Sequence, residues 1–120
     1  MALAITIENT DHFMTAHISG VADLAQMLEL AGNLVDEAKR RGARRLLVDL
    51  REVRQNLKLT EHIILSEKAV STFGRLERVA TIVPEGANRG TTEHAARQRG
   101  VQFRVFNSPE AAAGWISADQ

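Results

Sequence analysis

Two hydrophobic patterns alternate along the chain: short apolar runs typical of strands, and three-four spacings typical of helices. The most apolar run is Arg45-Leu46-Leu47-Val48-Asp49-Leu50. Leu46, Val48 and Leu50 would point to one face of a strand, and Leu47 and Asp49 to the other. Because a strand covered on both faces loses its polar alternation, this run predicts the central strand of a mostly parallel sheet flanked by helices. Ligands of such sheets bind beyond the carboxyl ends of the strands, so we expect function there.

A β-hairpin and a long helix are predicted before this strand. Hydrophobic residues alternate over 3–8, a polar turn follows, and a second strand over 12–18 is predicted to end at Ser19-Gly20. A three-four spacing then predicts a helix to about Arg41. Basic side chains in its last turn would interact favourably with the negative end of the helix dipole, and Gly42 would terminate the helix. The apolar face of that helix comprises Val21, Leu24, Leu28, Ala31, Val35 and Ala38.

After the central strand, residues 51–58 read as a polar loop. Thr60 would cap a second helix with Glu61 in its first turn, and that helix would end at Phe73 or Gly74. A strand over 77–83, a short helix over 88–99 and a strand over 101–106 follow. Ser108 as cap and Pro109 at the first helical position predict a final helix. The order ββαβαβαβα predicts an α/β fold with a mixed, mostly parallel five-stranded sheet, as one domain over residues 1–120.

Composition narrows the functional classes. Hydrophobic residues make up 44% of the 120 residues, and 15 basic side chains balance 15 acidic ones, so nothing draws the whole protein to nucleic acid. The absence of cysteine excludes a thiol nucleophile and a thiolate metal site. The sequence shows no signal-peptide pattern and no apolar run of roughly 20 residues, so we expect a cytoplasmic location without stable membrane anchoring.

Three stretches resemble the STAS and anti-sigma-factor-antagonist fold, including bacterial relatives grouped as SpoIIAA-like. They are Val48-Asp49-Leu50 before a polar loop and the second helix, the run over 78–86, and Val105-Phe106 before a Pro-Glu-Ala-Ala helix. The resemblance implies four parallel strands plus an antiparallel first strand, an architecture shared with the lipid-binding domain of Sec14-type carriers.

In partner-switching members of that family, a phosphorylated serine lies in an Asp-Ser-Ser-Gly stretch at the start of the second helix. The corresponding stretch here, 56–61, contains no serine, and its one hydroxyl belongs to Thr60. A helix N-terminus favours an anion, so Thr60 could accept phosphate, although a capping role for Thr60 is the simpler interpretation.

Other candidate chemistries are weak. The four histidines show no metal-ligand spacing: His12 and His17 would lie on opposite strand faces, and His62 and His94 on separate helices. Phosphate-binding and nucleophile-elbow motifs are absent. Asn88 or Thr91 reads as an ordinary helix cap near a glycine-containing loop. The basic residues over 39–45 read as solvated helix-end charge. We therefore expect no catalytic residue, metal or cofactor.

We predict a non-enzymatic regulatory or protein-binding module, with a carrier or sensor of a small apolar ligand as the alternative and an uncharacterised enzyme as the third choice. Ile64, Leu65 and Ala69 fall outside the Ile63, Val70 and Phe73 stripe that should face the sheet. They would need a second partner, either another copy in a homodimer or a groove within the chain. The predicted partner- or ligand-binding residues are Asp49, Arg51, Thr60, Glu61, Ile64, Leu65 and Asn88.

Overall fold

The computed structural model describes residues 3–10, 13–86 and 90–118. Its strands and helices follow the predicted order ββαβαβαβα. The strands are β1 (Ala4–Asn9), β2 (Met14–Ala22), β3 (Arg45–Gln55), β4 (Arg78–Ile82) and β5 (Phe103–Phe106), and the helices are α1 (Leu24–Arg40), α2 (Leu59–Phe73), α3 (Gly90–Arg99) and α4 (Pro109–Ser117).

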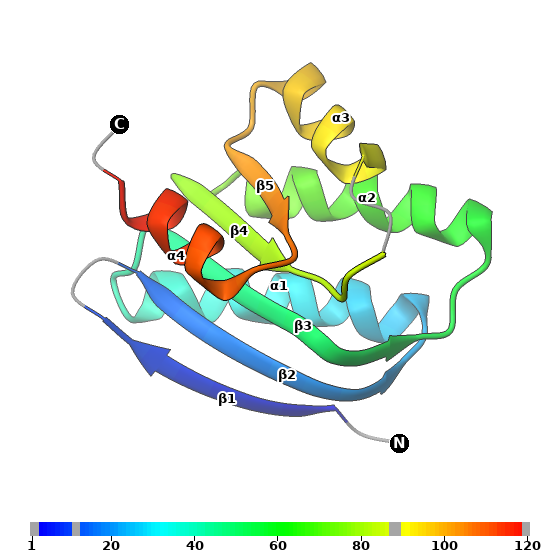
Figure 1. The fold of residues 1–120 in the computed structure, drawn as a ribbon, viewed down its shortest axis with the longest axis horizontal. Coiled ribbons are helices and arrows are strands. Elements are labelled where there is room, and N and C mark those ends of the chain that lie inside the picture. The colour runs from blue at the N-terminus through cyan, green and yellow to red at the C-terminus, as the bar shows by residue number, and fades with distance from the viewer. Residues whose placement is uncertain (1–2, 11–12, 87–89, 119–120) are drawn as a thin grey trace.

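The strands form one sheet in the order β1-β2-β3-β4-β5 (Figure 1). β1 is antiparallel to β2, and every later pair is parallel. β3 therefore lies in the middle, as its apolar run predicted. Leu46 and Val48 belong to the core on one face of the sheet, and Leu47 belongs to the core on the other.

The two faces carry different helices. The larger core lies beneath α1, α2 and α3, and the smaller one lies beneath α4. Ser108 caps α4 as predicted, because its Oγ accepts a hydrogen bond from the amide of Ala111 at 3.3 Å. Ala112 and Ile116 of α4 are buried against β3, β4 and β5.

Two predicted boundaries are wrong, and they have one cause. β2 continues through Ser19-Gly20 to Ala22, and β3 continues to Gln55 instead of giving way to a loop. Their ends pair with each other, from Ser19 opposite Glu52 to Ala22 opposite Gln55. A register shift after His17 and the positive φ of Gly20 (125°) accommodate the change, so hydrogen bonds between the strands outweigh the weak strand signal.

The first helix consequently starts later than predicted. Val21 lies in β2 and is exposed, whereas Asp23 caps α1 in a reciprocal pair of hydrogen bonds with Gln26. Gly42 follows the helix with a φ of 74°, as its predicted terminating role requires. The buried face of α1 comprises Met27, Leu30, Ala31, Leu34, Val35 and Ala38.

Candidate functional site

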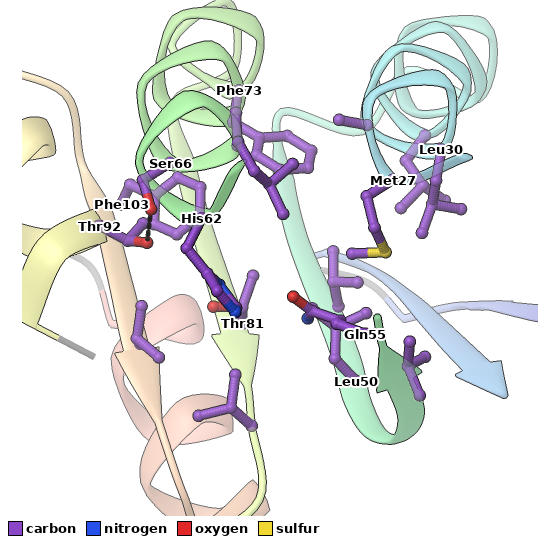
Figure 2. A pocket seen from close by; sticks show the side chains of 18 of the residues that line it. Met27, Leu30, Leu50, Gln55, His62, Ser66, Phe73, Thr81, Thr92 and Phe103 are labelled. Carbon is purple, nitrogen blue, oxygen red and sulfur yellow. Dashed lines mark hydrogen bonds between the residues drawn. The ribbon is translucent and has the colours of Figure 1, made fainter. Parts of the chain in front are cut away.

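A cavity of about 480 Å³ lies between α1 and α2, above β3 and β4. Its walls are mainly apolar, and Figure 2 shows Met27 and Leu30 on the α1 side, Phe73 on the α2 side and Leu50 on β3. The volume falls in the range of about 300 to 1,000 Å³ that is typical of small-molecule sites. The cavity reaches Gln55 and Pro84, which follow the apolar parts of β3 and β4. It therefore lies where the sequence predicted function.

Small side chains on α2 leave this space open. Ser66 and Ala69 are the buried residues of the middle of α2, and neither is long enough to fill the gap to the sheet. One turn further along, Val70 and Phe73 are buried, and the Phe73 ring packs against Phe103 with 5.4 Å between ring centroids. The helix is thus tightly packed at its carboxyl end and separated from the sheet near its amino end.

A few polar groups interrupt the apolar lining. The hydroxyls of Ser66 and Thr92 hydrogen-bond to each other at 2.8 Å. Gln55, His62 and Thr81 also line the cavity (Figure 2), and within the described ranges the structure shows no hydrogen bond from any of their side chains. Thr81 is only 6% exposed. The sequence did not predict that Gln55, His62 and Thr81 lie in one site, because the fold brings them together from different elements.

The start of α2 differs from the prediction. Lys58, not Thr60, is the N-cap residue, and its amide donates to the Glu61 carboxylate at 2.9 Å. Thr60 is the second residue of the helix, and its side chain is exposed. Glu61 can stabilise the helix start from its third position, so no capping hydroxyl is needed at position 60.

Apolar residues are exposed at this same end of α2. Leu59 is 75% exposed, and Ile63 and Ile64 are nearly half exposed. Leu65 packs partly buried against the core, and Ala69 is buried. The stripe assignment is therefore wrong for Ile63, and Leu65 and Ala69 find apolar contacts within the chain. Of the three residues offered for a homodimer, Ile64 alone remains exposed.

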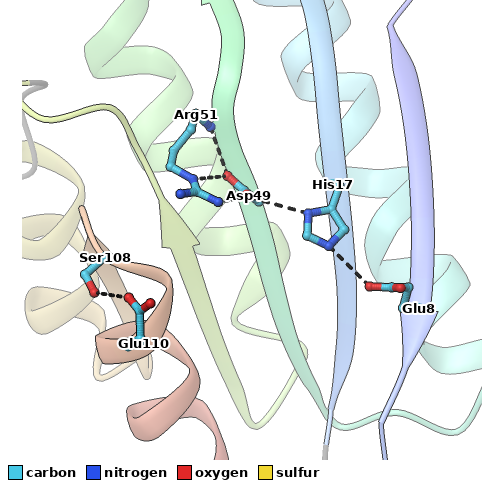
Figure 3. Close-up of polar contacts among 6 residues, drawn as sticks. All are labelled: Glu8, His17, Asp49, Arg51, Ser108 and Glu110. Carbon is cyan, nitrogen blue, oxygen red and sulfur yellow. Dashed lines mark hydrogen bonds and ion pairs between the residues drawn. The ribbon is translucent and has the colours of Figure 1, made fainter.

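A polar cluster lies on the opposite face of the sheet (Figure 3). The Arg51 guanidinium holds the Asp49 carboxylate through contacts of 2.7 and 3.0 Å, and His17 Nδ1 lies 3.4 Å from the same carboxylate. The other ring nitrogen of His17 lies 3.3 Å from Glu8. Hydrogen bonds from Arg51 lower the pKa of Asp49, although burial opposes this effect.

The predicted site residues therefore do not form one site. Asp49 and Arg51 pair with each other on the α4 side of the sheet, whereas Thr60, Glu61, Ile64 and Leu65 lie on α2. Asn88 falls outside the described residues. The prediction also missed that His17 joins the Asp49 pair, because the contact depends on the register between β2 and β3, which places these two residues side by side.

Metal binding and membrane spanning find no support in the described part of the chain. His62 and His94 lie on α2 and α3, respectively, and no group of three or more histidine, aspartate or glutamate side chains among the described residues could hold a metal ion. None of the described helices combines the length and apolar character needed to cross a bilayer.

The sheet order, the antiparallel first strand and the helix layers are those of the SpoIIAA-like fold. Similar solved structures include an uncharacterized protein with a SpoIIAA-like fold from Shewanella loihica PV-4, with 21% identity over 95% of this chain and 93% of that one and a TM-score of 0.59. An anti-sigma factor antagonist from Mycobacterium paratuberculosis shares 16% identity over 98% and 96% of the two chains, with a TM-score of 0.62. The anti-sigma factor antagonist SpoIIAA in its unphosphorylated form shares 13% identity over 92% and 94%, with a TM-score of 0.52.

No protein-family model matches the chain, and a search of curated proteins gives no match. The solved structures confirm the predicted resemblance at the level of the fold.

Proposed function

We propose that this protein is a non-enzymatic regulatory module that binds a small apolar molecule between α1 and α2. The observation that carries the proposal is the cavity of about 480 Å³ with its mainly apolar lining. Leu59 and Ile63 line the cavity and are also exposed, so they mark its opening. A ligand could enter there without unfolding the sheet.

The chemistry of the walls supports binding of an apolar molecule. Water inside would meet few hydrogen-bonding groups, whereas an apolar ligand would leave water at a gain of about 25 cal/mol for each Å² buried. The described lining contains neither a carboxylate nor an amine. A catalytic acid or base would therefore have to be His62 alone, which favours binding over catalysis.

A pair of alanine substitutions tests this proposal. Ala69 is buried and lines the cavity, so Ala69→Leu should fill part of it. Ala25 is exposed on α1, and Ala25→Leu adds the same side chain outside the cavity. With N-phenyl-1-naphthylamine as a neutral fluorescent probe, we expect binding by the parent and by Ala25→Leu, and at least tenfold weaker binding by Ala69→Leu. A parent protein that binds no probe, or equal binding by both variants, would contradict the proposal.

Protein binding at the start of α2 is the second candidate function. Leu59, Ile63 and Ile64 expose apolar surface next to each other on this helix, and a partner with an apolar surface would remove it from water. The similarity to anti-sigma factor antagonists adds support for a protein partner. A photo-crosslinking amino acid at position 64 should trap a defined partner in cells. The same group at exposed position 97 on α3 should not, and equal trapping would argue against this surface.

Thr60 fits this second function as a modification site. Its side chain is exposed at the second position of α2, where free backbone amides and the helix dipole favour a phosphate. Its neighbours Leu59 and Ile63 belong to the proposed partner surface, so a phosphate would place charge beside it. Phosphopeptide mass spectrometry of protein from its natural cell tests the modification, and Thr60→Ala provides the control.

A further inference from the structure

Thr81 is a polar side chain in the sheet that forms the floor of the cavity. It lies in β4 between Val79 and Val83, pairs in register with Val48 of β3, and faces the same core. Thr81 is 6% exposed, and its side chain makes no hydrogen bond with the described residues. No fully buried side-chain oxygen or nitrogen among the described residues lacks a partner, so the Thr81 hydroxyl must be open to the cavity. It can therefore hydrogen-bond to a group that enters the cavity from outside the chain.

Two further polar side chains converge on the same part of the cavity. Figure 2 shows His62 reaching from α2 towards Thr81, and Gln55 at the end of β3 pointing into the same space. The threonine hydroxyl, the glutamine amide and an imidazole N–H can all donate hydrogen bonds. The cavity lining supplies no carboxylate to accept them. Three side chains that can donate hydrogen bonds therefore face one part of the cavity from three elements. Such a place suits an acceptor, and an anionic acceptor would form the stronger, charge-assisted hydrogen bonds.

The remainder of the cavity is suited to hydrocarbon. Met27 and Leu30 on α1 and Phe73 on α2 continue the lining away from the polar group. We infer that the ligand is an aliphatic monocarboxylic acid, with its carboxylate at Gln55, His62 and Thr81 and its chain between α1 and α2. This inference rests on the proposed function, because it specifies the head group of the apolar ligand.

Displacement of N-phenyl-1-naphthylamine by decanoate and by decanol provides the test. The two competitors have the same chain length and differ in the head group, so their ratio measures recognition of the carboxylate. We expect decanoate to displace the probe from the parent protein at a concentration about tenfold lower than decanol, since hydrogen bonds to a charged group are the stronger ones.

Thr81→Val keeps the shape of the side chain and removes the hydroxyl. We expect this variant to bind decanoate several-fold more weakly than the parent and to lose most of the preference for decanoate over decanol. Its urea midpoint should equal or exceed that of the parent, because the substitution removes no hydrogen bond between described residues. A less stable variant would show that the hydroxyl already has a partner, and would overturn the inference.

Other outcomes separate the two proposals. If the parent binds the probe but does not distinguish decanoate from decanol, the carboxylate assignment is overturned while the apolar cavity stands. If the parent binds neither probe nor acid, the proposed function itself fails. Equal decanoate affinity in the parent and in Thr81→Val would also overturn the assignment.

Discussion

Truncation of Val48 should cost less stability than truncation of Val79. Both valines belong to the core beneath α1, α2 and α3, and they lie on the neighbouring strands β3 and β4. Val48 is 2% exposed and Val79 is 0% exposed. They differ in one respect: Val48 lines the cavity, and Val79 does not. The pair therefore compares one chemical change in two packing environments.

The magnitudes follow from the two contributions to a core truncation. Loss of two methyl groups from a buried valine costs about 1.5 kcal/mol in transfer free energy, at ~0.8 kcal/mol per group. At Val79 the change also leaves a new void of about 50 Å³, which adds about 1 kcal/mol at ~24 cal/mol per Å³. The Val48 side chain already faces the cavity on one side, so its truncation enlarges an existing void. Most of the free-energy cost of creating a new void is therefore absent at Val48.

We therefore expect Val79→Ala to lower the free energy of unfolding by about 2.5 kcal/mol and Val48→Ala by about 1.5 kcal/mol. Urea denaturation followed by circular dichroism measures both, provided that the slope of the unfolding free energy against urea is unchanged. If Val48→Ala costs as much as Val79→Ala, the cavity is closed in solution and the reasoning fails. An unchanged urea midpoint for Val48→Ala would show that β3 is not a core strand.

Three further predictions concern other parts of the fold. The pKa of Asp49 is lowered in the folded protein, so the ionised carboxylate stabilises the fold fully above its unfolded-state pKa. This contribution to stability is lost as pH falls below about 4. Thermal midpoints measured between pH 2 and 7 should therefore depend less on pH in Asp49→Asn than in the parent. Gly32→Ala should raise the urea midpoint by an amount equivalent to roughly 0.5 to 1 kcal/mol because a Cβ there meets no atom within 4 Å, whereas Gly74→Ala should lower it because a Cβ there meets a side-chain carbon at 3.0 Å and a carbonyl at 3.1 Å. Ile64→Glu should leave the fold intact and would convert any homodimer into a monomer, whereas Leu65→Glu should destabilise the domain; sedimentation and urea denaturation distinguish these effects, and equal loss of stability would contradict the packing of α2.

The sequence by itself determined the order of the elements and the central place of β3. Local signals are strong there: the apolar run over 46–50 requires cover on both faces, and Ser108-Pro109 supplies both a cap and a helical first residue. These signals depend on residues close in the chain, and they require no knowledge of the partner element. The fold class followed from the same local information, because alternating strands and helices of this length allow few arrangements.

Only the tertiary structure decided where the strands end and which side chains lie together in the candidate site. Residues 51–55 are polar enough to read as a loop, yet they form strand because residues 19–22 of β2 pair with them. His17 meets Asp49 for the same reason, through the register of two strands far apart in sequence. The cavity depends on small residues at 66 and 69 of α2 facing a gap that α1 and the sheet define together. Neither the gap nor the approach of His62 and Gln55 to Thr81 follows from a periodic pattern, because each depends on the distance between elements that the chain brings together only on folding.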